Sequence, residues 1–250
     1  AADIARVIRD DPGLAARLLK IVNSAFFSFP RRVETVSQAV TVVGTAQVRD
    51  LALATSVITM FADVPSEVVD MESFWKHSVG AGVCARVFAG HRREGNVERF
   101  FLMGLLHDIG RLIMLMQLAE ETGRALVRAR DEGQPAHAVE REECGFDHGQ
   151  VGGALLEQWN LPASLQEAVQ YHHRPRLASR FPVETAAVHV ADIVAHALEL
   201  GCSGERRVPA LAPEAWEALG IDVETVPVIL DEIEAQYEAV SNLVDNALAA

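Results

Sequence analysis

Apolar residues recur along most of the chain at the three- and four-residue intervals of amphipathic helices. One such helix is expected to begin at Asp11–Pro12, a pattern typical of an N-cap followed by proline in the first turn. Its apolar stripe consists of Leu14, Leu18, Leu19 and Val22. Pro30 is expected to end this segment, because proline lacks the backbone N–H that a continuing helix needs.

Two capping boxes, Thr35–Gln38 and Asp147–Gln150, predict the starts of two further helices. Runs of alternating polar and apolar residues and hairpin signals are both missing, so the sequence predicts an all-α fold. Pro65 is expected to separate an N-terminal helical lobe, 1–64, from a helical core, 65–250, within one continuous module. Periodicity and stop residues predict the other helices at 46–61, 70–93, 97–109, 111–131, from Pro135 to Gly145, from Pro162 to His172–His173, at 184–200 with Gly201 as the stop, and at 227–248.

Composition narrows the class of protein. Half of the 250 residues are hydrophobic, which is enough for a large core. Uninterrupted apolar runs such as Leu51–Met60 stop short of the ~20 residues that a membrane-spanning helix needs, so no membrane segment is expected. No secretory signal is expected either. The net charge of −13 argues against nucleic-acid binding, although bound metal ions would still let a small anion approach. Cys84, Cys144 and Cys202 lack CxxC spacing and favour reduced thiols in a cytoplasm. Because a helix is expected from the first residues, the chain is expected to be a fragment of a longer protein.

The candidate chemistry lies in histidine and aspartate residues placed among apolar neighbours. Imidazole and carboxylate are ligands for iron, manganese, zinc and similar ions. A carboxylate can bridge two ions, and Asp108 is the natural bridge if two are bound. A single residue of this kind is more often a hydrogen-bonded core position or a solvated helix end than a metal ligand, so the ordered set carries the prediction. The set is His77, His107, Asp108, His148, His172, His173 and Asp192.

The order of that set resembles the two-metal HD-GYP phosphodiesterases of the HD superfamily. The N-terminal sequence is more similar to a related family, the HD-related output domain or HDOD, and Gly104–Arg111 fits both. The resemblance covers about residues 1–200. The segments that carry it are Asp11–Phe26, Val36–Val40, Val43–Gly44, Val48–Ala52, Phe146–Gly152, Trp159–Pro162 and His172–Pro175.

The resemblance implies an HD-superfamily helical bundle with an HDOD-type N-terminal lobe, and it implies two metal sites. One ion would take His77, His107, Asp108 and Asp192, and a second would take Asp108 as bridge with His148, His172 and His173. The chain departs from the HD-GYP pattern, because Arg174 stands where Glu is usual, Arg180–Pro182 replaces Gly-Tyr-Pro, and Arg111 replaces Lys.

Two functions follow from these residues. The first is a non-catalytic bacterial signalling module that binds one or two metal ions and contacts other signalling proteins, with a homo-oligomer as one arrangement. The second is a metal-dependent phosphohydrolase acting on a nucleotide or cyclic dinucleotide, with Asp108 bridging the ions and Arg111 steadying the phosphate. The HDOD resemblance favours the first function, and the complete ligand set favours the second. Asn23 and Ser24 are compatible either with a junction for a partner or with a simple helix cap.

Overall fold

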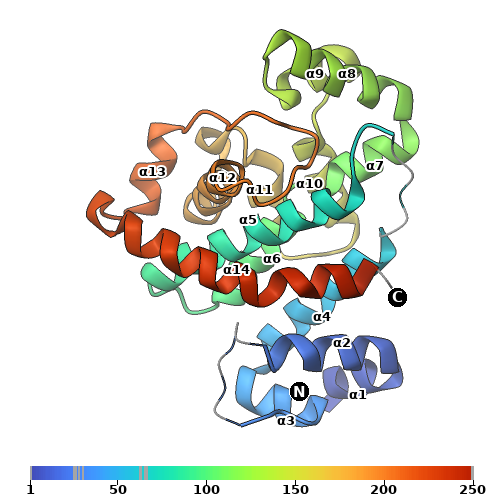
Figure 1. Ribbon diagram of the computed structural model, residues 1–250, viewed down its shortest axis with the longest axis vertical. Helices are drawn as coiled ribbons and strands as arrows, with labels where there is room; N and C mark the ends of the chain where they lie inside the picture. Colours follow the sequence, from blue (N-terminus) through green and yellow to red (C-terminus); the bar gives the residue numbers. More distant parts are fainter. Residues whose placement is uncertain are drawn as a thin grey trace.

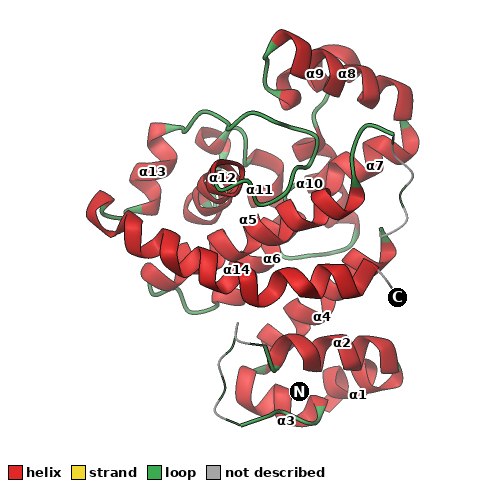
Figure 2. Cartoon of the chain, in the orientation of Figure 1, coloured by secondary structure: helices red, strands yellow, loops and turns green. Residues whose placement is uncertain are grey.

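The computed structural model describes residues 2–248 apart from 25, 26, 28, 30, 62, 63, 65 and 66, and this part of the chain is helical with no strand (Figure 2). The predicted all-α fold is confirmed. The α-helices are α1 (Ala2–Asp10), α2 (Pro12–Val22), α3 (Val36–Val43), α4 (Thr45–Met60), α5 (Met71–His91), α6 (Val97–Leu106), α7 (Ile109–Gln117), α8 (Ala119–Glu132), α9 (Ala136–Cys144), α10 (His148–Gln158), α11 (Ala163–Tyr171), α12 (Pro182–Ala197), α13 (Pro213–Leu219) and α14 (Val226–Leu248), and η1 (Pro175–Leu177) and η2 (Val223–Thr225) are short 3₁₀ turns.

The N-terminal helices α1 to α3 form a small group at one end of the molecule (Figure 1). The predicted caps hold this group together: Asp11 accepts a hydrogen bond from the Leu14 backbone N–H, and Thr35 and Gln38 form the expected capping box. Pro30 and Phe26 lie outside the described residues. The caps therefore place α2 and α3 where the pattern of polar and apolar positions puts them.

Helix α4 leads from this group into the larger helical body, where it packs on α6 and α14 (Figure 1). One hydrophobic cluster runs through both parts and includes Ala5, Val48 and Val240. The predicted division at Pro65 falls outside the described residues, and the division into 1–64 and 65–250 stays a prediction. The shared cluster shows that the N-terminal group is packed against the rest rather than separate from it.

Helix α5 lies in the centre of the larger body and packs on α6, α12 and α14. The contact with α6 is close because both helices present glycine: a Cβ on Gly104 would lie 2.5 Å from the Ala81 carbonyl oxygen. Gly110 brings α7 equally close to α10, because a Cβ there would lie 2.0 Å from the His148 carbonyl oxygen. These backbone approaches bring together the helix ends that carry His107 and His148.

Several predicted boundaries were wrong. The expected helix 111–131 is two helices, because the backbone leaves helical geometry at Leu118 (φ −138°, ψ 50°) with no proline or glycine to mark the break. The expected helix 184–200 ends at Ala197, since Glu199 adopts a left-handed conformation (φ 54°) before Gly201. The sequence pattern also missed α13 and both 3₁₀ turns.

The stretch Val97–Gln117 is long and apolar enough to cross a membrane, contrary to the expectation drawn from uninterrupted apolar runs. In the structure it is α6 and α7, and 83% of its most apolar 18-residue window is buried inside the protein. Such burial is what core helices show. The apolar character of this stretch is therefore accounted for by the core around His107 and Asp108.

Candidate metal centre

The structure brings all seven candidate ligands into one buried cluster, although they come from five places in the sequence. His77 lies on α5, the His107–Asp108 pair links α6 to α7, and Asp192 lies on α12. His148 begins α10, and the His172–His173 pair directly follows α11. Their ligand atoms fall into overlapping groups in which all atoms lie within 4.8 Å of one another. Six of the seven are buried, and His173 is partly exposed. We call these seven residues the histidine–aspartate cluster.

Two histidines of the cluster are oriented by the carbonyls at the ends of their own helices. His107 Nδ1 donates to the Gly104 carbonyl oxygen and His172 Nδ1 donates to the Val169 carbonyl oxygen, both at 2.7 Å. When the ring is neutral, this arrangement puts the lone pair on Nε2, which points into the cluster. Both Nε2 atoms are buried without a hydrogen-bond partner in the described part of the chain. A ring held by its Nδ1–H with an unpaired Nε2 is the usual arrangement of a metal-ligating histidine.

The carboxylates of the two aspartates lie beside the imidazole rings of the cluster. Asp192 Oδ1 lies 3.2 Å from His77 Nε2 and 3.5 Å from His107 Nε2. Asp108 Oδ2 lies 3.4 Å from His107 Nε2, and Asp108 Oδ1, which is 2.9 Å from His148 Nε2, is buried and makes no hydrogen bond among the described residues. Buried polar atoms are rarely left unpaired, so these orphaned atoms point to a missing ligand. The donor set, imidazole with carboxylate, fits a transition-metal ion.

Mutual contacts set the charges of the cluster. Burial opposes ionisation of Asp108, but Arg111 and His107 beside it hold the pKa of its carboxyl well below the usual range. Burial would lower the pKa of His107, yet the carboxylates of Asp108 and Asp192 raise this pKa to about 10. Burial and then the neighbouring His107 lower the pKa of His172 to about 3. The cluster therefore contains ionised carboxylates beside at least one imidazole that is neutral at physiological pH.

Glu140, on α9, is a member of the site that the sequence interpretation missed. Its side chain is fully buried, and Oε2 accepts from the His148 backbone N–H at 2.9 Å and lies 2.5 Å from His148 Nδ1. Although burial would raise the pKa of Glu140, His148 and Arg111 lower this pKa to about 2. Glu140 therefore orients the His148 ring as an ionised carboxylate. A signal was present, because Glu140 shares a helix face with the buried Ala136 and Val139.

Arg111, expected to steady a phosphate, lies inside the protein with 1% of its surface exposed. Nη1 donates to Asp108 Oδ2 at 3.1 Å and to Ser203 Oγ at 2.7 Å, and Nε donates to Glu140 Oε1 at 3.4 Å. Nη2 lies 3.0 Å and 3.2 Å from the two ring nitrogens of His148. Internal groups thus surround every nitrogen of this guanidinium.

The sequence of the chain matches a known family. Residues 1–175 match the HDOD domain model. The chain belongs to the HDOD family. The family assignment from the sequence resemblance is therefore confirmed, although the matched region ends before the expected limit near residue 200.

This HDOD chain also resembles individual proteins. An uncharacterised protein of Treponema pallidum (strain Nichols) is 25% identical over 173 residues, which is 69% of this chain and 33% of that protein, so the chain spans about a third of this relative. An HDOD domain protein of unknown function from Geobacter sulfurreducens has a TM-score of 0.81 at 22% identity, covering 98% of this chain and 86% of that one. A candidate signal transduction protein from Marinobacter aquaeolei VT8 has a TM-score of 0.74 at 22% identity, and the match covers 100% of this chain and 55% of that one. These two structures share the fold of the HDOD chain.

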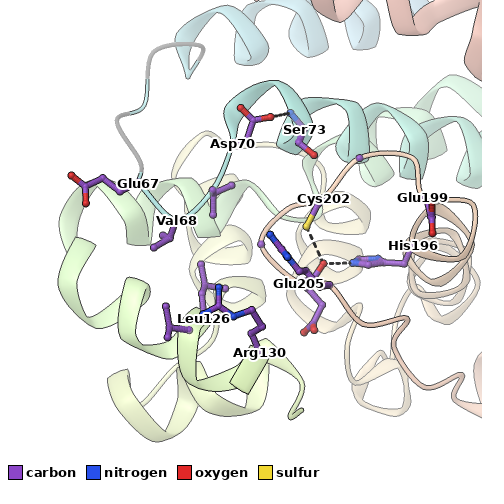
Figure 3. A pocket seen from close by; sticks show the side chains of 15 residues that line it. Glu67, Val68, Asp70, Ser73, Leu126, Arg130, His196, Glu199, Cys202 and Glu205 are labelled. Atoms are coloured by element: carbon purple, nitrogen blue, oxygen red, sulfur yellow. Dashed lines mark hydrogen bonds between the residues drawn. The ribbon is translucent and has the colours of Figure 1, made fainter. Parts of the chain in front are cut away.

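Two pockets border the cluster of the HDOD chain. One, of about 590 Å³, is shown in Figure 3, with His196 in its wall. His196 Nδ1 lies 3.0 Å from Asp192 Oδ1, and its Nε2 donates to the Glu205 carbonyl oxygen at 3.2 Å. The other pocket, of about 300 Å³, is lined by His137, His173 and Arg207 among others. Solvent therefore approaches the cluster at its His196 end and at its His173 end.

Several residues around these pockets position the cluster without belonging to the predicted set. His189 Nδ1 donates to the His172 carbonyl oxygen at 2.7 Å and so fixes the turn after α11. Arg174, which stands where HD-GYP proteins carry Glu, lies near Asp147, with Nη2 donating to Oδ2 at 3.2 Å. The spacing from Asp192 to His196 (i, i+4) is a sequence signal that the two share a helix face. Ser203 lies in irregular chain, where no sequence pattern marks it.

Proposed function

We propose that this HDOD chain is a signalling output module of the bacterial cytoplasm, in which a metal ion in the histidine–aspartate cluster serves structure rather than turnover. The HDOD family and a cluster able to hold a metal ion are its established features. The observation that carries the proposal is the environment of Arg111. The cation expected to hold a substrate phosphate is buried and surrounded by internal partners, so it is not free to bind a phosphate from solvent.

The cluster fits a structural ion for a second reason. It joins the ends of helices that are far apart in the sequence, from α5 to α12. A bound ion would supply Lewis acidity and bonds between these helices, and the free energy of its binding would add to the stability of the fold. The fold likeness to a candidate signal transduction protein is consistent with this role. Other signalling domains are the expected partners.

A specific observation favours the alternative, a metal-dependent phosphohydrolase. His173 is partly exposed and lines a pocket of about 300 Å³ that also carries His137 and Arg207. A small phosphate ester could reach the edge of the cluster there. A candidate metal-dependent phosphohydrolase from Shewanella amazonensis SB2B shares the fold. Nucleotides and cyclic dinucleotides are the substrates that this alternative predicts.

One experiment separates the two functions. The purified chain is loaded anaerobically with Fe²⁺, Mn²⁺ or Zn²⁺, its metal content is measured, and it is incubated with bis(p-nitrophenyl) phosphate and with cyclic dinucleotides. The signalling proposal predicts a metal-loaded protein with no hydrolysis above the metal-only blank. Hydrolysis that the Asp108→Asn variant loses would favour the phosphohydrolase and overturn the proposal.

A further inference from the structure

The two ends of the histidine–aspartate cluster differ in how their polar atoms are satisfied. At one end, His107 Nε2 and His172 Nε2 are buried and unpaired among the described residues, and both face carboxylate oxygens of Asp108. His107 Nε2 also faces Asp192, and the ligand atoms of His107, His172 and Asp192 lie within 4.8 Å of one another. A ligand is needed at this end to pair these atoms.

At the other end, the imidazole nitrogens have closer protein neighbours, although Asp108 Oδ1 makes no hydrogen bond there among the described residues. Both ring nitrogens of His148 have neighbours: Nδ1 lies 2.5 Å from Glu140 Oε2, and Nε2 lies 2.9 Å from Asp108 Oδ1. His173 Nε2 lies 2.9 Å from His148 Nε2. Arg111 packs its Nη2 against the same His148 ring. Both ring nitrogens of His148, and Nε2 of His173, therefore have a protein neighbour.

The charges of the cluster also favour a metal ion at one end and Arg111 at the other. Asp108, Asp192 and Glu140 are carboxylates with at most 3% of their surface exposed, and Arg111 is the buried cation in contact with two of them. A single divalent ion and the guanidinium carry three positive charges, which equal the three carboxylates before any protonated imidazole is counted. A second divalent ion would leave two uncompensated positive charges away from water, which is strongly unfavourable.

We infer that Arg111 takes the place of a second metal ion, and that the cluster holds one divalent ion between His77, His107, Asp108, His172 and Asp192. His148, His173 and Glu140 then form the side that Arg111 completes. The inference rests on the metal-binding part of the proposed function. The pocket in Figure 3 reaches His196, which contacts Asp192 at the same end of the cluster.

The first test is the number of ions bound. The metal-free chain is titrated with Mn²⁺ and with Zn²⁺ by calorimetry, and bound metal is counted by mass spectrometry after gel filtration. The expected result is about one ion per chain. Two tightly bound ions per wild-type chain would overturn the inference.

The adjacent histidines provide a matched pair. The two-ion arrangement uses both His172 and His173, whereas the one-ion arrangement uses only His172. His172→Ala is expected to weaken Zn²⁺ binding by about a hundredfold or more, and His173→Ala by less than about threefold. Equal losses in the two variants would contradict the inference. Circular dichroism shows whether both variants are folded.

A second pair tests the charge of Arg111 directly. Arg111→Gln removes the guanidinium charge and is expected to raise the stoichiometry towards two ions, whereas Arg111→Lys keeps a positive charge and should stay at about one. A folded Arg111→Gln variant that still binds one ion would contradict the inference. If Arg111→Gln fails to fold, the number of ions bound by the wild-type chain and the comparison of His172→Ala with His173→Ala still test the inference.

The result is distinguishable from failure of the proposed function. Two ions without hydrolysis would overturn the role of Arg111 and leave the signalling module standing. One ion with hydrolysis that depends on Asp108 would support the role of Arg111 and overturn the signalling module.

Discussion

The histidine–aspartate cluster and the N-terminal signature segment both carry family motifs, yet they use polar residues in opposite ways. In the N-terminal segment, Asn23 caps α2 through the Leu19 carbonyl oxygen and pairs with both the N–H and the carbonyl oxygen of Val33, each at 2.7 Å. Ser24 Oγ donates to the Ile21 carbonyl oxygen at 2.7 Å. In the cluster, by contrast, His107 and His172 keep unpaired ring nitrogens. Asn23 and Ser24 pair with the backbone and so serve the fold, whereas the unpaired ring nitrogens of His107 and His172 are prepared for a ligand.

The largest effect is expected from the cluster. Asp108→Asn keeps the shape of the side chain but removes the charge that faces His107, His148 and Arg111. We expect metal affinity to fall by about a hundredfold or more, because carboxylate charge is what holds the cation. Competition of Zn²⁺ with a coloured chelator measures this change. An Asn variant that binds Zn²⁺ as tightly as the wild-type chain would show that Asp108 is not a ligand.

Gly110→Ala tests whether the cluster depends on the close approach of α7 and α10. A Cβ at Gly110 would lie 2.0 Å from the His148 carbonyl oxygen, so the helices must separate, and the free energy of unfolding should fall by about 3 kcal/mol or more. Urea unfolding followed by circular dichroism gives the value. Gly90→Ala is the matched control, because nothing lies within 4 Å of a Cβ there, and it should be neutral or stabilising by up to about 1 kcal/mol.

Asn23→Ala separates the two regions most directly. It leaves the Val33 backbone groups without their partner, and we expect a loss of about 1–3 kcal/mol in unfolding free energy with unchanged metal affinity. Lys20→Ala, at an exposed position of the same motif, should change neither quantity. Loss of metal binding in a folded Asn23→Ala protein would show that the two regions are coupled.

The smallest effect concerns Glu98, a carboxylate of α6 that is 3% exposed and lies outside the cluster. Burial raises its pKa, although Arg86 Nε donates to Oε1 at 3.0 Å. Since the folded-state pKa lies above the unfolded one, the neutral form stabilises the fold at low pH, and this stabilisation is lost as the pH rises through the folded-state pKa.

Glu98→Gln removes that dependence. The variant and the wild-type chain should have similar stability in acid, and the variant should become the more stable of the two as the pH rises towards neutral. Urea unfolding of both proteins from about pH 4 to about pH 8 measures the difference. A wild-type chain that gains stability over the variant as the pH rises would contradict the sign.

The sequence predicted helices and caps well because their causes are local. Asp11, Thr35 and Asp147 form their caps with residues three positions away, so the pattern alone places them. The break at Leu118 and the early end of α12 have no proline or glycine at the cap position, so the residue pattern did not mark them. Gly110 lies within α7 and allows the close contact of this helix with α10.

The cluster was predictable as a set of residues and less so as an arrangement. The order of the histidines and aspartates indicated that they meet, and the structure brings them together. The partners of Arg111 could not be read from the sequence, because Glu140 and Ser203 contact it from 29 and 92 positions away. Their contacts exist only once α9 and the chain after α12 are folded onto α7.

The region matched to the family ends at residue 175, whereas Asp192 lies on α12, beyond that limit. The shared family region therefore carries most of the histidines but lacks one of the two aspartates. Relatives could keep the HDOD fold and still gain or lose a cation through changes in α12 alone. Sorting them into metal-dependent and metal-free members requires reading the helix that the family signature leaves out.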